Sequence, residues 1–252
     1  MPATESIAEL ARRLAAAARI TILTGAGVSV ASGVPTFRGA EGLWKNFAPE
    51  ELATPEAFAR NPDLVWEWYN WRRELIAGCR PNTAHEVIAL WSRRFPRLKL
   101  ITQNVDGLHE KAGTEGVIRF HGSIWEMLCW EGCAGSPGRW RDERAPLPQL
   151  PPSCPHCGGL ARPGVVWFGE AIDPAVMRQS LEAAECDLFL AVGTSAVVYP
   201  AAGLAAAARS NGAFVVEVNP EVTPGSRAID LSIQGRAEEI LPAVDSRISG
   251  GA

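Results

Sequence analysis

The sequence lacks any apolar run that could cross a bilayer, since its longest ones fall well short of the roughly 18 to 20 residues required. Its first ten residues carry acids and lack the basic start and apolar centre of a signal peptide. We therefore expect a cytoplasmic protein. There is no internal repeat, and no low-complexity segment beyond the last four residues, so a repeat architecture is not expected.

The chain also lacks an excess of basic residues. Its 24 Lys and Arg are outnumbered by 28 Asp and Glu, which gives a formal net charge of −4. This balance argues against nucleic-acid binding, although it leaves a local basic patch open. With 252 residues, 47% of them apolar, the chain can form one large domain or a large domain with a small insertion.

The six cysteines of a chain expected to be intracellular do not predict a disulfide framework. Four of them form two close pairs, Cys129-x3-Cys133 and Cys154-x2-Cys157. Four thiolates from two short turns can complete a tetrahedral zinc site, and such a site has no position open for a substrate. We therefore predict a structural zinc ion; the alternative is four unrelated free thiols.

Apolar runs of strand length alternate with helical patterns along most of the chain. Strands are expected at residues 19–24, 98–102, 187–192 and 213–218. Helices are expected at residues 7–19, 62–78, 82–94, 174–185, 201–210 and 237–248. This alternation predicts an α/β fold with a Rossmann-like, doubly wound parallel sheet that is covered on both faces.

Residues 129–157 break the alternation, because they are rich in Gly, Pro and Arg and carry the cysteine pairs at their ends. We predict that they form a small zinc-binding module inserted into a Rossmann-like domain of residues 1–128 and 158–252. Part of residues 39–80 is expected to belong to the smaller domain as well.

A glycine-rich turn, Gly25-Ala26-Gly27, directly follows the first expected strand. Glycines here let the backbone approach a pyrophosphate, whose charge is stabilised by amide groups at the start of the next helix. Val30 replaces the third glycine of the dinucleotide motif, so the turn alone leaves open a tight connection without a nucleotide. The broken motif also argues against a hydride-transferring dehydrogenase.

Three further expected strands end directly before Gln103, Gly193-Thr194 and Asn219. Open parallel sheets bind ligands at the carboxyl ends of their strands, so these residues are suited to line a nucleotide crevice.

Ordered motifs make the chain similar to the sirtuin family from about residue 20 to residue 241. They are Gly25-Ala26-Gly27-Val28-Ser29 with Ser32-Gly33-Val34-Pro35-Thr36-Phe37-Arg38, then Gln103-Asn104-Val105-Asp106, His121-Gly122-Ser123, Val166-Trp167-Phe168-Gly169-Glu170, Gly193-Thr194-Ser195 and Asn219-Pro220. The resemblance implies an NAD-dependent protein-lysine deacylase that consumes NAD as a co-substrate and releases nicotinamide and O-acyl-ADP-ribose.

The resemblance also assigns NAD-binding residues. Asn104 and Asp106 would hold the nicotinamide and its ribose, with Ser29 and Arg38 close by. The full expected set is Gly25, Ala26, Gly27, Ser29, Pro35, Thr36, Phe37, Arg38, Trp44, Gln103, Asn104, Val105, Asp106, Gly193, Thr194, Ser195, Asn219, Pro220, Glu221 and Ala237.

Among the four histidines, His121 is the catalytic candidate. The residues alone indicate a structural His85 at a helix start, a hydrogen-bonding His109 that supports the site, and a His156 in a turn. The resemblance makes His121 catalytic together with Asn104. In the reaction it implies, the acyl-lysine oxygen displaces nicotinamide, and the histidine then takes a proton from a ribose hydroxyl.

Arg72 has no acidic neighbour three or four residues away, and it shares a helix face with Tyr69. A guanidinium among apolar groups is costly unless an anion reaches it; it can also snorkel to water or pair with a distant acid. Tyr69-x-x-Arg72 and Ala40 match the class III sirtuins, whose acyl pocket favours succinyl, malonyl or glutaryl groups. The resemblance thus implies a desuccinylase and demalonylase with deacetylase activity.

The substrate is expected to be an acylated-lysine protein or peptide, bound as an extended strand between residues 165–170 and 196–199. Val166, Phe168 and Gly169 are the expected contacts, whereas Trp167 is either a contact or a core residue. No nucleic-acid or membrane partner is expected. The alternatives are a plain NAD-dependent deacetylase, a protein ADP-ribosyltransferase and an NAD-binding regulatory module.

Overall fold

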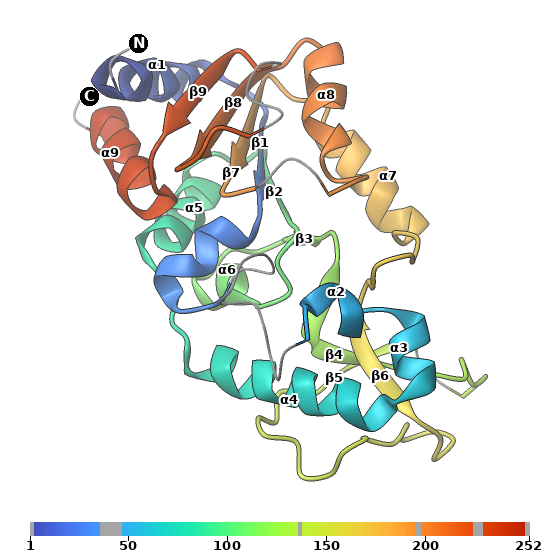
Figure 1. Ribbon diagram of the computed structural model, residues 1–252. Coiled ribbons are helices and arrows are strands. Elements are labelled where there is room, and N and C mark those ends of the chain that lie inside the picture. Colours follow the sequence, from blue (N-terminus) through green and yellow to red (C-terminus); the bar gives the residue numbers. More distant parts are fainter. Residues whose placement is uncertain (1–2, 36–46, 136–137, 195–197, 224–228, 250–252) are drawn as a thin grey trace.

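The computed structural model describes residues 3–35, 47–135, 138–194, 198–223 and 229–249, and its centre is a six-stranded parallel sheet (Figure 1). The strand order is β3-β2-β1-β7-β8-β9. The strands are β1 (Ile20–Thr24), β2 (Leu98–Thr102), β3 (Ile118–Arg119), β7 (Leu188–Val192), β8 (Phe214–Asn219) and β9 (Leu231–Gln234). The chain winds outward from β1 in one direction and from β7 in the other, which places a ligand-binding crevice between these two strands. The predicted fold class is confirmed.

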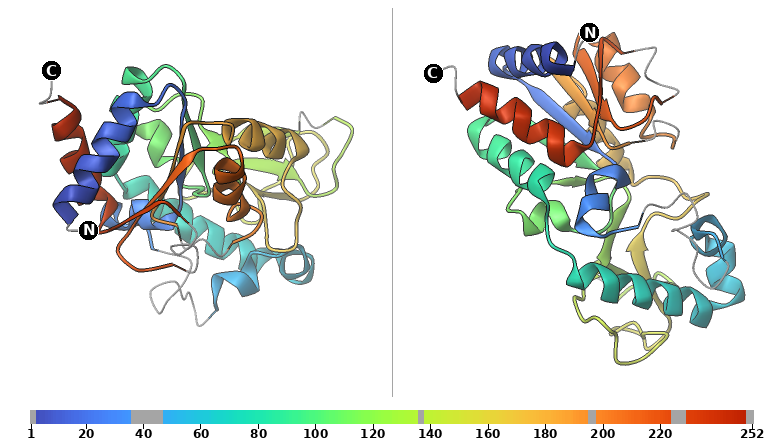
Figure 2. Two further views of the ribbon diagram at one scale, coloured as in Figure 1. Left: turned by 90° about the horizontal axis from the view of Figure 1, so that it is seen from above. Right: turned by 60° about the vertical axis from the view of Figure 1, so that its left-hand side comes forward.

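Helices cover both faces of this sheet because successive strand residues point to opposite sides. Ile20 and Ile22 of β1 pack against one group of helices, whereas Leu23 packs against the other. The first group is α1 (Ala3–Ala16), α5 (Thr83–Arg94) and α9 (Ala237–Ser249), and the second is α7 (Pro174–Ala183) and α8 (Gly203–Ser210). Figure 2 shows the two groups on either side of the sheet. Within the described ranges, no helix is both long and apolar enough to cross a membrane.

A second, antiparallel sheet has the strand order β5-β4-β6. Its strands are β4 (Gly122–Cys129), β5 (Arg139–Arg141) and β6 (Ala161–Val165). The helices α2 (Pro49–Leu52), α3 (Pro55–Arg60) and α4 (Pro62–Gly78) share a hydrophobic core with it. This smaller unit lies beyond one end of the parallel sheet in both figures. It includes strand residues outside 129–157, and the domain boundaries stated above stay a prediction.

Polar anchors hold α4 against the smaller sheet. The helix begins after Asn61, whose side chain accepts a hydrogen bond from the amide of Leu64. Trp66 Nε1 donates to the Ala161 carbonyl of β6 at 2.8 Å. Arg73 is fully buried and donates to the carbonyl of Ile124 in β4 at 2.5 Å. These hydrogen bonds fix the orientation of α4 against the smaller sheet, and with it the position of Tyr69 and Arg72.

Candidate functional site

The crevice floor starts at the glycine turn, where β1 passes through Gly25 into η1 (Ala26–Ser32), a short 3₁₀ helix. Gly27 N donates to the Gly193 carbonyl at 2.9 Å. A Cβ added at Gly25 would lie 2.8 Å from the Gly193 oxygen, and one at Gly27 would lie 2.8 Å from Gly193 Cα. The close contact of η1 with the end of β7 therefore requires these glycines, whatever ligand the turn binds.

Ser29, Asn104 and Asp106 form a buried polar network beside this turn. Asn104 Nδ2 donates to the Gly25 carbonyl at 3.0 Å and to Ser29 Oγ at 3.2 Å. Ser29 Oγ donates to Asp106 Oδ2 at 2.7 Å. Burial raises the pKa of Asp106, while its hydrogen bonds from Leu108 N and Ser29 oppose that shift. Three residues far apart in the sequence thus form one preorganised polar surface.

Two buried histidines lie under this network. His85 and His109 have ring centroids 4.7 Å apart, and burial lowers the pKa of each to about 3, so both are neutral near pH 7. His85 Nδ1 accepts from Asn82 N in a capping box at the start of α5, and its Nε2 lies 3.5 Å from Ser29 Oγ. Sequence reasoning found the helix role of His85 and missed its contact with Ser29, because no local pattern indicates it.

His121 lies between β3 and β4, where its ring is half-buried. Its Nδ1 is 3.1 Å from the Gln103 carbonyl oxygen. A carbonyl oxygen only accepts, so Nδ1 carries the ring proton and Nε2 keeps a free lone pair. Burial lowers the pKa of His121 from 6.5, opposed by the hydrogen bond to Gln103. His121 is therefore a neutral base at physiological pH.

The ends of β2, β7 and β8 are joined by side-chain hydrogen bonds. Gln103 Nε2 donates to Thr194 Oγ1 at 3.0 Å, and Asn219 Nδ2 donates to the Thr194 carbonyl at 3.2 Å. Pro220 and Glu221 follow as exposed residues, and Ala237 is buried at the start of α9. The predicted crevice residues of these three strand ends are thus brought together.

Several predicted site residues lie outside the described residues, and three others are described but have no side-chain hydrogen bond to this network. The first set is Thr36, Phe37, Arg38, Ala40, Trp44 and Ser195. Pro35 is half-buried at the end of the first described range, Ala26 is half-buried in η1, and Val105 is buried beside Asn104.

Tyr69 and Arg72 are buried side by side on α4, with 3% and 7% of their surface exposed. Trp167 Nε1 donates to Tyr69 Oη at 2.9 Å. The guanidinium carbon of Arg72 lies 5.3 Å from the ring centroid of Trp68. Burial raises the pKa of Tyr69 to about 12, and burial lowers the pKa of Arg72. The structure thus brings the two residues of the predicted acyl pocket together.

The segment that continues from β6 passes directly beside His121. Val166 N donates to the His121 carbonyl at 2.9 Å, and Phe168 N donates to the Ala53 carbonyl at 2.9 Å. Phe168 is 40% exposed, and Gly169 is exposed with a φ of +86°. Trp167, in contrast, is buried in the core of the smaller unit, which resolves the two readings of this residue in favour of the core.

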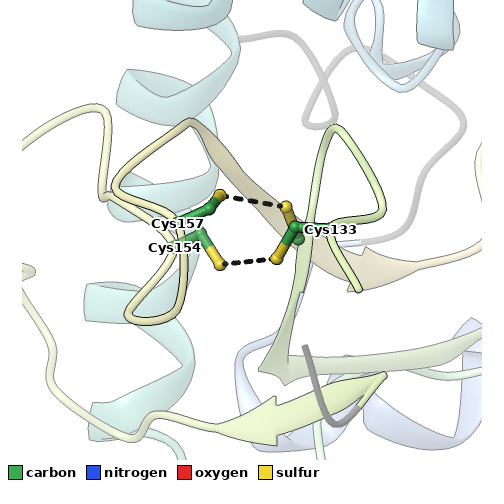
Figure 3. A group of neighbouring side chains, drawn as sticks. Cys133, Cys154 and Cys157 are labelled. Atoms are coloured by element: carbon green, nitrogen blue, oxygen red, sulfur yellow. Dashed lines mark hydrogen bonds between the residues drawn. The ribbon is translucent and has the colours of Figure 1, made fainter. Parts of the chain in front are cut away.

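The four paired cysteines converge between the end of β4 and the turn before β6 (Figure 3). All four Sγ atoms lie within 4.8 Å of one another. Cys129 and Cys157 are 3.7 Å apart, and Cys133 and Cys154 are 3.8 Å apart. A tetrahedral zinc ion with Zn–S bonds of about 2.3 Å needs sulfur–sulfur distances of about 3.8 Å. The cluster therefore fits a structural zinc ion whose ligands all come from the protein.

A protein-family model described as the Sir2 family matches residues 25–200, well over half of the chain. The chain belongs to the Sir2 family. This is the sirtuin family that the sequence motifs resemble. The Sir2 chain is 53% identical over 227 residues to an NAD-dependent protein deacylase of Aquifex aeolicus (strain VF5), covering 89% of this chain and 93% of that one.

Solved Sir2 structures share the fold along nearly the whole chain. A Sir2 homologue in complex with NAD is 42% identical with a TM-score of 0.89, covering 96% of this chain and 94% of that one. A Sir2 protein with a deacetylated p53 peptide and 3′-O-acetyl ADP-ribose is 28% identical with a TM-score of 0.84, covering 94% and 96%. The glycine turn and buried polar network of this Sir2 chain fit NAD as its co-substrate.

Proposed function

We propose that this Sir2 protein removes acyl groups from protein lysine side chains in an NAD-dependent reaction and favours acyl groups that end in a carboxylate, such as succinyl. The deacylation is supported by family membership and by a 53% identical relative named NAD-dependent protein deacylase. The acyl preference is supported by one observation above all, the burial of Tyr69 and Arg72 on one face of α4.

NAD, when bound, supplies a ribose carbon from which nicotinamide leaves. The turn at Gly25 and Gly27 would hold its phosphates, while Asn104 and Asp106 would hold its nicotinamide ribose. Hydrogen bonds already link Asn104 to Ser29 and Ser29 to Asp106, so these groups are ordered in advance. The entropy cost of ordering these side chains when NAD binds is therefore smaller, which favours affinity.

His121 would act as the general base. Its Nδ1–H is directed at the Gln103 carbonyl, so the free lone pair on Nε2 is the one that would take a proton from a ribose hydroxyl. The low pKa that burial produces keeps this lone pair available at neutral pH. Gln103 therefore acts by holding the ring in the useful tautomer and orientation.

The acyl pocket would use charge to distinguish acyl groups. Burial disfavours the charged form of Arg72 and the charge of Asp106 opposes that effect, and a carboxylate that enters the pocket would add a charge-assisted hydrogen bond to the guanidinium. The hydroxyl of Tyr69 would add a second bond. An acetyl group carries no distal carboxylate and gains neither interaction.

The peptide would lie along the segment after β6. Val166 is tied to the His121 carbonyl, and the exposed Phe168 and Gly169 follow it, so a peptide strand beside this segment would bring its lysine close to the catalytic base. A relative's complex with a deacetylated p53 peptide supports a peptide substrate.

The Arg72→Met variant tests the acyl preference. We expect kcat/KM for a succinyl-lysine peptide to fall by well over tenfold (about 1.4 kcal/mol per factor of ten), with deacetylation of the matched acetyl peptide retained. Arg72→Lys, which keeps the charge and loses the planar fork, should retain part of the preference. Equal loss of both activities would contradict the pocket.

Product analysis of the wild type separates the alternatives. Release of nicotinamide together with O-acyl-ADP-ribose identifies deacylation. Transfer of labelled ADP-ribose to protein identifies an ADP-ribosyltransferase, and turnover of acetyl peptides alone identifies a plain deacetylase.

A further inference from the structure

Tyr69 accepts a hydrogen bond from a side chain that the proposed reaction does not use. Trp167 Nε1 lies 2.9 Å from Tyr69 Oη, although the two residues are 98 positions apart in the sequence. Both are buried, with 2% and 3% of their surface exposed. An indole N–H can only donate, so the phenol oxygen is the acceptor and its own hydrogen remains to be donated elsewhere.

The indole of Trp167 is itself held firmly. The guanidinium carbon of Arg162 lies 3.6 Å from its ring centroid. Arg162 donates to Glu170 through two nitrogens, at 2.5 and 2.9 Å, and Glu170 also accepts from Trp167 N at 2.8 Å. Phe58 packs against the same ring with centroids 5.3 Å apart. The position of the indole N–H is therefore determined by contacts from three other side chains.

We propose that Trp167 is a positioning residue for acyl selectivity: by donating to Tyr69 it turns the phenol hydrogen toward the distal end of the bound acyl group, beside Arg72. This inference rests on the proposed acidic-acyl function. A carboxylate then accepts from the phenol and the guanidinium together, whereas a short acyl group offers no acceptor at that depth.

The protonation of Tyr69 supports its role as a donor. Burial raises the pKa of Tyr69 to about 12, even though the hydrogen bond from Trp167 and the charge of Arg72 both lower it. The phenol hydrogen is thus present throughout the pH range of an assay. Arg72 follows Tyr69 by three residues on α4, so the two side chains share one face of the helix.

The Trp167→Phe variant tests the inference, because it keeps an aromatic ring in the core and removes the N–H donor. Trp91→Phe is the matched control: Trp91 is also fully buried and donates through Nε1, but it lies on α5 in the core of the parallel sheet and donates to Asp245 of α9. We expect Trp167→Phe to lower the succinyl-to-acetyl ratio of kcat/KM by about five- to tenfold, as the loss of one oriented hydrogen bond implies. Trp91→Phe should lower thermal stability and leave the ratio within about twofold of wild type.

Tyr69→Phe gives a second readout that does not require Trp167→Phe to fold, and a double-mutant cycle joins the two. Tyr69→Phe alone should lower the ratio, and adding Trp167→Phe should lower it no further, since both act through one hydroxyl. An unchanged ratio in Tyr69→Phe, or in a folded Trp167→Phe, would overturn the inference, as would independent, additive losses.

The same assays distinguish a failure of the proposed acidic-acyl function from a failure of the proposed role of Trp167. A wild type without succinyl preference, or one whose preference survives Arg72→Met, contradicts the acidic-acyl pocket itself. A wild type that prefers succinyl and loses this preference in Arg72→Met, but keeps it in Trp167→Phe, contradicts only the role of Trp167.

Discussion

At the residue scale, the direction of each hydrogen bond determines the chemistry of the crevice. His85 accepts at Nδ1 from the amide of Asn82, so its remaining hydrogen is on Nε2 and faces Ser29. Ser29 in turn donates to Asp106. His121 has the opposite tautomer, since its Nδ1 faces a carbonyl. The neighbouring groups thus place the ring proton on Nε2 in His85 and on Nδ1 in His121. Of these two histidines, only His121 offers a free lone pair to a substrate.

We expect the pH dependence of activity to follow the protonation of His121, the proposed general base. Burial lowers its pKa below 6.5, so the base is fully available at neutral pH and is lost by protonation as the pH falls through that lowered value. We expect kcat/KM to be flat around pH 7 and to show an acid limb below 6.5. His121→Tyr should abolish turnover and keep the circular-dichroism spectrum of the wild type. An acid limb above pH 7, or an active His121→Tyr variant, would show that another group is the base.

At the element scale, the contact between η1 and the end of β7 defines the shape of the crevice. It depends on three glycines, because Gly193 has a φ of +60° and the added Cβ atoms of Gly25 and Gly27 would meet its backbone. Backbone atoms cannot move aside as a side chain does. Val30, where a dinucleotide motif has its third glycine, is 52% exposed, so this fold has no close helix contact there that would require one.

Substitution at Gly27 tests this contact. Gly27→Ala should destabilise the protein by about 1–3 kcal/mol, because the Cβ would lie 2.8 Å from Gly193 Cα. It should also raise the KM for NAD. Gly78→Ala is the control, since a Cβ at this last residue of α4 meets nothing within 4 Å. Denaturant unfolding measures both variants, and equal stabilities for the two would show that the close contact costs nothing to relax.

At the scale of the whole molecule, the cysteine cluster and the proposed acyl pocket share one hydrophobic core. Trp130 follows the cysteine at the end of β4 and packs against Phe58, with centroids 4.9 Å apart, and against Trp167, with centroids 6.3 Å apart. A zinc ion in the cluster thus supports the same core that holds Tyr69. The parallel sheet has its own core around β1.

Zinc removal should therefore affect the smaller unit first. Purified protein is expected to contain one equivalent of zinc, and a strong chelator should lower its thermal stability and its turnover of all acyl peptides alike. The far-ultraviolet signal of the parallel sheet and its helices should largely remain, and added zinc should restore activity. Metal analysis and thermal unfolding check this. Absence of zinc, or unchanged stability after chelation, would show that the cysteines are free thiols.

Local patterns in the sequence predict the long helices and strands and the cysteine cluster. Four strands of the parallel sheet and helix α4 lie close to where the apolar periodicity predicts them. A strand that is buried on both faces gives a continuous apolar run, and a helix that is buried on one side gives an apolar stripe at helical spacing, so both leave a strong pattern. The sequence did not reveal β9, a four-residue strand with alternating exposure, nor the small sheet with β6, whose sequence is Ala-Arg-Pro-Gly-Val. Short strands that contain Pro and Gly have a low β-propensity, so whether they form depends on pairing with neighbouring strands.

Which polar atoms meet depends on how the elements pack. The family resemblance implied that Ser29, Asn104 and Asp106 lie in one site, whereas the cysteine spacing by itself predicted a cluster. The contact of His85 with Ser29, and that of Trp167 with Tyr69, join elements that the sequence separates by 56 and 98 residues. Such contacts depend on how whole elements pack, which no local pattern encodes.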